Sequence, residues 1–175
     1  MTFSNGAGEE QITAKIILNS WGEETLADIF YGYSDEKYSR RIARGIVEAR
    51  NKKPIETTSE LVEIIKQSVP FSYQRGKIHF ATKTFQALRM AVNDEVEALK
   101  EGLSKGIEVL DSGGRIAVIS FHSTEDRIVK DTFREWQKNG LGKMINKKPI
   151  TAGEEEIREN PRSRSAKLRI FQKND

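Results

Sequence analysis

The sequence predicts an α/β fold with a helical first part, up to about residue 80, and a second part that mixes helices and strands. In the first part, apolar residues recur every three or four positions, which is the spacing of the buried face of an amphipathic helix. In the second part, the run Arg115 to Ile119 is rich in β-branched residues, follows the turn Gly113-Gly114 and has no helical period. Near the end, residues 166–172 alternate between apolar and polar side chains, as a half-exposed strand does. Together these patterns predict a sheet of about three strands with helices mostly on one side.

The composition is typical of a soluble globular domain, with 175 residues, 37% of them hydrophobic and 31% charged. The chain has no cysteine and only two histidines, so we expect neither a disulfide framework nor a metal site. No apolar run approaches the length of a transmembrane helix and the N-terminus lacks a signal-peptide profile, which predicts a cytoplasmic protein. A net charge of +3 and a pI near 9.0 weakly favour a nucleic-acid partner.

The first part of the chain reads as a series of short helices. Residues 1–11 are polar and are expected to be loose, and a first helix is predicted at 12–20. A second helix follows, with one apolar face over 26–33. The residues of that face are Leu26, Ile29, Phe30 and Tyr33.

The third helix carries a basic stripe. Ser34 can cap this helix, whose apolar residues again repeat every three or four positions. One interpretation of the stripe is a surface that faces RNA, and the other is an ordinary solvated face. We keep both open because the only acidic residues nearby are Asp35, Glu36 and Glu48. The basic residues are Lys37, Arg40, Arg41, Arg44 and Arg50.

A fourth helix is predicted after Thr57 and Glu60, which have the spacing of a capping box, and Pro70 ends it. Residues 71–80 form a connection of mixed character.

A long helical pattern covers residues 81–110. Gly102 and Gly106 predict that it divides into two consecutive helices. Arg89 and Asn93 lie four residues apart, on one face of the first of them. This polar pair can contact a ligand, or it can be ordinary surface.

The strand at Arg115–Ile119 leads into the most informative segment. An uninterrupted apolar run suits a strand covered on both faces, as in a parallel α/β sheet. Ser120 and the residues after it then lie at the carboxyl end of the strand, where such sheets place their ligands. Ser123 and Asp126 have the spacing of a capping box for the next helix. We therefore expect a site at His122 and its serine neighbours; alternatively, His122 satisfies backbone groups between strand and helix.

The remaining segments complete the α/β part. A helix is predicted at 124–138, a strand within 144–151 and a short helical turn at 154–158. Residues 160–165 form a loop, and the final strand covers 166–172, with an antiparallel edge strand as its simplest interpretation.

Several segments, in this order and spacing, resemble one known family. Residues 81–89 read Ala-Thr-Lys-Thr-Phe-Gln-Ala-Leu-Arg, and Val-Asn-Asp-Glu follows at 92–95. Residues 113–127 contain Gly-Gly-Arg, then Ser-Phe-His-Ser and Glu-Asp-Arg; residues 160–169 read Asn-Pro-Arg-Ser-Arg-Ser-Ala-Lys-Leu-Arg. With Arg-Arg-Ile-Ala-Arg at 40–44, they resemble the bacterial small-subunit ribosomal RNA cytosine-N4 methyltransferases, the MraW/RsmH family.

The resemblance implies a domain organisation. Residues 1–80 match the family's helical insert for substrate recognition, and residues 81–175 match the C-terminal part of its Rossmann-like class I methyltransferase sheet. In the family, a preceding half holds S-adenosylmethionine through a Gly-rich loop and an acidic residue, and neither has a counterpart in this sequence. The resemblance thus implies an N-terminally truncated chain, inactive alone, that binds no cofactor by itself. The sheet edge left uncovered predicts self-association.

The implied reaction is methylation of the exocyclic amine of a cytidine in 16S ribosomal RNA, with the RNA or the small ribosomal subunit as partner. The amine is a poor nucleophile and must be oriented, which we assign to Ser120, His122 and Ser123 at the end of the strand. For Arg162 and Arg164, the alternative to RNA contact is that they hold the last loop on the sheet. The predicted RNA-binding residues are Arg40, Arg41, Arg44, Arg89, Asn93, Arg162, Arg164, Lys167 and Arg169.

Two other functions compete with that of an enzyme fragment. The first is a cofactor-free RNA-binding module that kept the substrate-recognition half. The second, a helix-turn-helix DNA binder over residues 34–69, is weak because Pro54 and a long connection separate its helices. An upstream reading frame that continues into a Gly-rich loop would favour the enzyme over the binding module.

Overall fold

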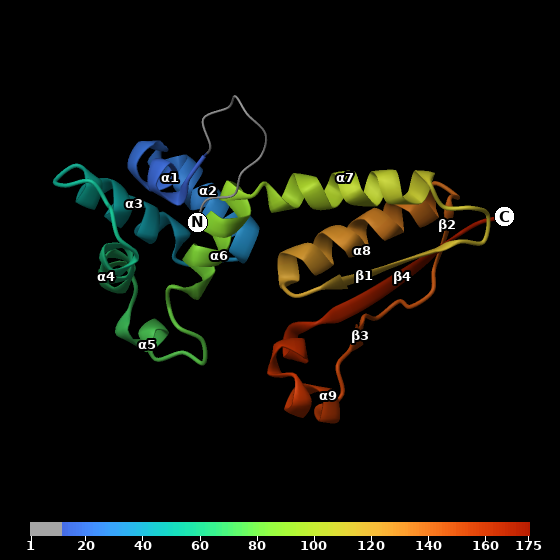
Figure 1. Cartoon of the computed structure of the whole chain (residues 1–175). Helices are drawn as coiled ribbons and strands as arrows, with labels where there is room; N and C mark the ends of the chain where they lie inside the picture. The colour runs from blue at the N-terminus through green and yellow to red at the C-terminus, as the bar shows by residue number, and fades with distance from the viewer. Residues whose placement is uncertain (1–11) are drawn as a thin grey trace. The chain divides into compact units, whose positions relative to one another are not determined.

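The computed structural model describes residues 12–175, so the loose segment predicted at 1–11 lies outside the described residues. The chain divides into two compact units, the first ending at Glu95 and the second beginning at Val96, each with its own hydrophobic core (Figure 1). The first unit is helical and the second combines helices with a small antiparallel sheet, so the predicted α/β class is confirmed as a mixed fold.

The division between the units lies further along the chain than the predicted boundary after residue 80. The cause is helix α6 (Thr82–Val92), which packs against α2 (Glu23–Ser34). Ala87 and Leu88 of α6 are buried in the core of the first unit. The periodicity of α6 predicts a buried face but not which helices cover it.

The apolar faces predicted for the first unit form its core. Leu26, Phe30, Ile42, Ile46 and Ile65 are fully buried. Burial of one such side chain contributes about 1.5–3 kcal/mol, and this packing stabilises helices too short to be stable alone. Besides α2 and α6, the unit contains α1 (Ala14–Ser20), α3 (Ser39–Arg50), α4 (Thr58–Ser68) and α5 (Phe71–Gln74).

The predicted capping box at the start of α4 is confirmed. The Thr57 hydroxyl accepts the Glu60 N–H at 3.2 Å, and the Glu60 carboxylate accepts the Thr57 N–H at 2.9 Å. A hydrogen bond from the Lys53 ammonium, together with the N–H groups of Glu56 and Thr57, lowers the pKa of Glu60 to about 2.

The predicted cap of the third helix is wrong. Ser34 is the last residue of α2, and its hydroxyl donates to the Phe30 carbonyl at 2.7 Å. Asp35, with φ of 51°, adopts the left-handed conformation that ends α2, and α3 begins only at Ser39. Aspartate tolerates this conformation better than most residues, which explains a helix end without glycine.

The long helical pattern divides in two as predicted, but at another place. The break falls at Asn93-Asp94, where Asp94 has φ of 48°, and α7 (Glu95–Glu108) then continues through both glycines. A glycine inside a helix costs about 1 kcal/mol without breaking it. Gly106 packs closely against the sheet, because a Cβ there would lie 2.9 Å from Cδ1 of Ile116 and would displace the end of that side chain.

The core of the second unit lies between two helices and one face of the sheet. Leu103 and Ile107 of α7 meet Phe133 and Trp136 of α8 (Ser123–Lys138), and Phe171 contributes from the sheet. The other elements are β1 (Arg115–Ser120), β2 (Gly142–Met144), β3 (Ile150–Thr151), α9 (Glu154–Glu159), a 3₁₀ helix (Pro161–Ser165) and β4 (Lys167–Lys173). Across residues 12–175, the structure has no helix that is both long and apolar enough to span a membrane.

The sheet corrects two predictions. β4 is central: it pairs antiparallel with β1 on one side and with β2 and β3 on the other, so the edge-strand interpretation is wrong. Among the described residues β1 pairs only with β4, and alternate residues of β1 are exposed, so it is not a parallel strand covered on both faces. β1 and β2 are parallel to each other, since both oppose β4, and α8 connects them as in a βαβ unit. A local apolar run cannot reveal that a distant strand is inserted between them.

The single strand predicted within 144–151 is two short strands around Asn146. The Asn146 amide donates to the Leu168 carbonyl at 2.9 Å, and its oxygen accepts the Ile170 N–H at 2.8 Å. The side chain thus replaces backbone pairing on β4 where the partner strand is interrupted.

Candidate functional site

The predicted site at the end of β1 is formed by three residues with different exposures. Ser120 is 3% exposed, and its hydroxyl donates to the Lys167 carbonyl of β4 at 3.4 Å. His122 is half-buried, and Ser123, the first residue of α8, is exposed. Chain geometry therefore brings the three together, but only His122 and Ser123 reach the surface.

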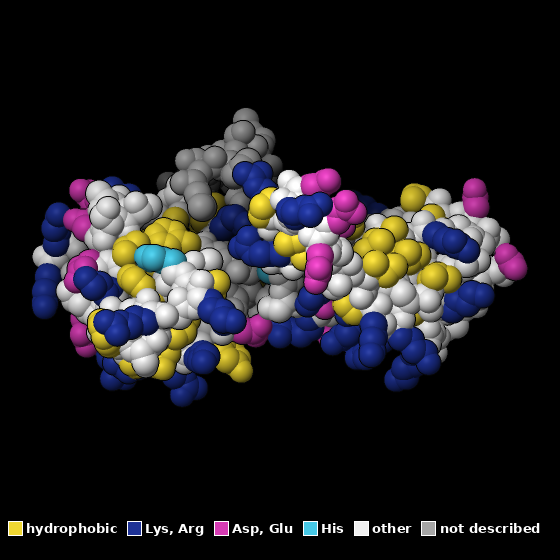
Figure 2. Space-filling view, turned by 90° about the horizontal axis from the view of Figure 1, so that it is seen from below, with side chains coloured by type: hydrophobic (Ala, Val, Ile, Leu, Met, Phe, Trp, Pro, Cys, Tyr) yellow, Lys and Arg dark blue, Asp and Glu magenta, His cyan; other side chains and the backbone are white. Residues whose placement is uncertain are grey.

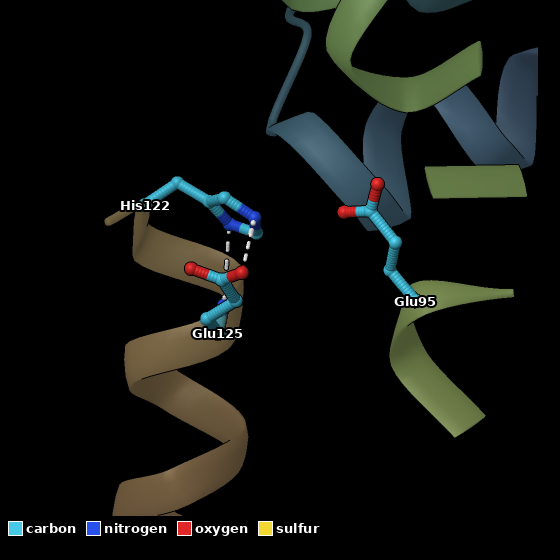
Figure 3. Close-up of side chains that lie close together, drawn as sticks. All are labelled: Glu95, His122 and Glu125. Atoms are coloured by element: carbon cyan, nitrogen blue, oxygen red, sulfur yellow. Dashed lines mark hydrogen bonds and ion pairs between the residues drawn. The ribbon is translucent and has the colours of Figure 1, made fainter. Parts of the chain in front are cut away.

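His122 is the N-cap of α8. Its Nδ1 accepts the Glu125 N–H at 3.3 Å (Figure 3). The Glu125 carboxylate in turn accepts the Phe121 N–H at 2.8 Å. The arrangement resembles a capping box, with an imidazole in place of the usual hydroxyl and with the Glu125 carboxylate on the N–H of the residue before the cap. The predicted role of Ser123 as the cap is wrong, because the cap lies one residue earlier.

The helix cap determines which ring nitrogen of His122 carries the proton and can donate it to a ligand. An Nδ1 that accepts a hydrogen bond carries no proton, so the neutral ring has its proton on Nε2. Nε2 is buried, lies 3.2 Å from Glu125 Oε1 and makes no hydrogen bond with any described residue. Burial disfavours the charged Glu125, yet the adjacent His122 side chain and the hydrogen bond from the Phe121 N–H outweigh it and lower the pKa of Glu125.

Asp126 anchors the start of α8 to the sheet. Its carboxylate accepts Arg169 Nε at 2.7 Å and Nη2 at 3.2 Å, and Lys167 Nζ lies 3.4 Å away. Burial opposes ionisation, but Arg169 and Lys167 outweigh it and lower the pKa of Asp126. Arg169 is 4% exposed, whereas the other predicted RNA-binding residues are exposed or half-buried. Its alternation with apolar neighbours suggested a solvent-facing side chain, and no local signal revealed the partner on α8.

Three of the four arginines of α3 are exposed. Arg44 lies 3.5 Å from Glu23, and the Arg41 guanidinium lies 5.8 Å from the centre of the Tyr38 ring. Arg40 is exposed, whereas Arg50 is half-buried and donates to the Leu18 carbonyl. The stripe therefore presents three arginines to solvent, Arg40, Arg41 and Arg44.

Arg162 and Arg164 project from the 3₁₀ helix. Between them, Ser163 is 3% exposed and its hydroxyl donates to the Asn160 carbonyl at 2.8 Å. Arg164 donates to the Pro161 carbonyl of the same turn, at 3.2 Å, and not to the sheet. This short element holds two exposed arginines on either side of a buried anchor.

Arg89 and Asn93 share one partner in the first unit. Arg89 makes two hydrogen bonds with Glu95, at 2.8 and 2.9 Å, and the Asn93 amide donates to the same carboxylate at 3.2 Å. The Asn93 oxygen is buried and accepts no hydrogen bond from any described residue. Glu95 thus compensates the charge of Arg89.

Glu36 is a structural residue that no local sequence pattern reveals. It is fully buried, and its carboxylate accepts the Tyr38 N–H at 2.9 Å and the Tyr73 hydroxyl at 2.7 Å. The sequence shows Glu36 only as an acidic residue next to a basic stripe. Its partner lies 37 positions away, beyond the reach of local patterns.

Comparison with known proteins identifies the family. The sequence model of the MraW methylase family matches residues 7–174. The chain belongs to the MraW methylase family. Family membership confirms the resemblance drawn from the motifs at 81–95, 113–127 and 160–169.

Curated relatives carry one name, ribosomal RNA small subunit methyltransferase H. The protein of Persephonella marina is 56% identical over 158 residues, which cover 90% of this chain and 54% of the relative. Those of Coprothermobacter proteolyticus and Synechocystis sp. are 50% and 52% identical, over 94% of this chain and 54% and 52% of their own lengths. The chain spans about half the length of the curated relatives it matches.

Proposed function

We propose that this chain is part of an S-adenosylmethionine-dependent methyltransferase that modifies the N4 amine of a cytidine in small-subunit ribosomal RNA, and that it is inactive alone. The main support is the match to relatives named ribosomal RNA small subunit methyltransferase H, of which the chain spans only about half. In this proposal, the first unit recognises the substrate and the second is the C-terminal part of a Rossmann-like domain.

The carboxyl end of β1 offers few free groups for the methyl donor. A site for it needs carboxylates and backbone N–H groups that are free to receive its polar groups. At the carboxyl end of β1, Glu125 and Asp126 are engaged by the Phe121 N–H and by Arg169, and the His122 ring occupies the Glu125 N–H. We therefore assign donor binding to residues outside this chain.

In this proposal, the end of β1 positions the target base. The cytosine amine has a delocalised lone pair, so the enzyme must hold it in line with the methyl group. His122 Nε2 carries the ring proton and can donate to the base, while the Ser123 hydroxyl can donate or accept. In this tautomer His122 orients the base and does not remove its proton.

The proposed RNA surface excludes Arg169, because that side chain is buried and paired with Asp126. Exposed cations at other predicted positions can neutralise phosphates, which supply most of the affinity in protein–RNA contacts. Arg89 is paired with Glu95, and Lys167 is paired with Asp126. Each would give up its ion pair to contact a phosphate. The remaining members are Arg40, Arg41, Arg44, Asn93, Arg162 and Arg164.

Calorimetric titration of the purified 175-residue chain with S-adenosylmethionine tests the proposal. We expect no heat of binding, because no free carboxylate or helix N-terminus at β1 receives the donor. Joined to the part of a curated relative that the chain does not match, the protein should bind the donor and methylate ribosomal RNA. Saturable binding by the chain alone would overturn our assignment of the donor site.

The alternative, a cofactor-free RNA-binding module, is supported by the exposed arginines of α3 and the 3₁₀ helix. The two functions differ in what precedes the chain in its gene. An upstream frame without a Gly-rich loop, in a protein that binds RNA, would favour the module.

We also propose that the chain self-associates through its sheet. By strand register, Ile119, Leu168 and Ile150 form a row on the face opposite the core, with Ala117 and Ile170 beside them. Ile119 and Ile150 are 58% and 53% exposed, and β1 pairs with one strand only among the described residues. An exposed apolar face beside an open strand edge favours association with another copy.

Substitution Ile119→Lys is expected to convert the associated chain to monomer, because it places a charge in the centre of this row. Static light scattering at increasing concentration measures the change. Val109→Lys is the matched control, since Val109 is 82% exposed and lies outside the sheet. A wild-type chain that stays monomeric at high concentration would disprove self-association.

A further inference from the structure

The stretch between α4 and the end of α6 combines basic and aromatic residues without any acidic one. Residues 64–93 contain no aspartate or glutamate. Such a long interval is unusual in a chain with 26 acidic residues, and it gives this part of the first unit a positive charge. The basic residues in the interval are Lys66, Arg75, Lys77, Lys83 and Arg89.

Within this stretch, α5 presents an aromatic ring to solvent. Phe71 is 63% exposed and does not belong to the core of the unit. The Arg75 guanidinium lies 4.3 Å from the centre of the Phe71 ring. The face in Figure 2 shows yellow hydrophobic side chains beside dark blue lysines and arginines over the first unit. A single exposed aromatic side chain is ordinary on a protein surface, but this one lies within a stretch whose charged residues are all basic.

Although α5 has only four residues, polar contacts hold it in place. The Tyr73 hydroxyl donates to the fully buried Glu36 carboxylate at 2.7 Å, and the Gln74 amide donates to the carbonyls of Lys66 and Val69. Burial and the Glu36 hydrogen bond raise the pKa of Tyr73 above its usual range. These hydrogen bonds hold the backbone of α5, and therefore of Phe71, in place.

The support also connects α5 with the basic stripe of α3. Tyr73 contacts the ring of Tyr38 edge-on, with ring centres 4.9 Å apart. The Arg41 guanidinium lies over the ring of Tyr38. A ligand with alternating charged and flat groups could contact Arg41 and Phe71 together. Single-stranded RNA has this chemistry, because each nucleotide carries one phosphate and one base.

We infer that Phe71 and Arg75 form a stacking platform for an unpaired RNA base, with phosphates contacting the lysines of the 64–93 interval and Arg41. The inference rests on the proposed function in that RNA is the substrate, and it adds a contact outside the site at β1. Duplex RNA keeps its bases stacked internally, so the platform favours single-stranded segments.

Fluorescence anisotropy with a labelled, unstructured RNA oligonucleotide and the whole chain tests the platform. Loss of one base–aromatic stack weakens binding by about 5-fold to 150-fold. We expect Phe71→Ala to fall in this range for single-stranded RNA and to leave binding of an RNA duplex unchanged. Phe71→Leu should be as weak as Phe71→Ala, because the flat ring is what stacks.

Tyr31→Ala is the matched control, since Tyr31 is 64% exposed on α2, and it should bind as the wild type does. Circular dichroism confirms folding of each variant. Equal affinity of Phe71→Ala and wild type for single-stranded RNA would overturn the platform while leaving the proposed function intact. A wild-type chain that binds no RNA even at low salt would overturn both.

Discussion

Asp126→Ala is expected to lower the free energy of unfolding of the second unit by about 3–5 kcal/mol. The substitution leaves the Arg169 guanidinium, whose side chain is 5% exposed, with only the Lys147 carbonyl at 3.5 Å. An unpaired buried charge costs far more than the pair itself contributes. Urea unfolding measures the loss, followed by the fluorescence of Trp136 in a Trp21→Phe background, so that the signal reports the second unit.

A double variant separates loss of the pair from loss of packing. Asp126→Leu combined with Arg169→Met removes both charges and should recover most of the stability, because apolar replacements of buried ion pairs are often neutral. Asp131→Ala is the surface control: Asp131 lies 3.6 Å from Lys130 with its side chain 57% exposed, and its loss should change little. Equal losses for Asp126→Ala and the double variant would show that the ion pair is not what anchors α8.

The ion pair between Asp126 and Arg169 also predicts that the second unit loses stability at acidic pH. The pKa of Asp126 is lower in the folded chain than its ordinary value of 3.8. Its contribution to stability is therefore complete above about pH 4 and is lost as the pH falls through the folded pKa. Asp126→Asn should flatten the dependence of unfolding free energy on pH in this acidic range.

The helices of the first unit follow from the sequence because each contains its own signal. Periodic apolar residues gave the faces of α2, α3 and α4, and the spacing of Thr57 and Glu60 gave a cap that local backbone geometry satisfies. The start of α3 was missed because Ser34 serves the helix before it, and a serine that ends one helix resembles one that begins another.

The sheet and the polar anchors could not be read locally. β1 is apolar on both faces, but its partner β4 lies about fifty residues later, and only pairing shows that one face stays open. Arg169 alternates with apolar residues as an exposed strand residue does, and its burial depends on Asp126 of another element. The motifs nonetheless led to the family, because a sequence motif can be matched without knowing which of its residues contact one another in the fold.

His122→Asn, introduced into the chain joined to the unmatched part of a curated relative, is expected to lower kcat by about 100-fold with little change in stability. Asparagine is among the best N-cap residues, so it can still accept the Glu125 N–H, but it lacks the Nε2–H that we assign to the base. Methylation of ribosomal RNA under single-turnover conditions measures the rate, and urea unfolding of the same variant measures the cap.

His122→Ala completes the comparison because it removes both functions. It should show the same loss of rate and an additional loss of about 1 kcal/mol in unfolding free energy, the usual effect of deleting a cap. If His122 serves only as a cap, asparagine will restore full activity and alanine will reduce stability alone. Because Nδ1 faces the backbone of α8 and Nε2 is the one ring nitrogen left for a substrate, the asparagine variant assigns each nitrogen its role.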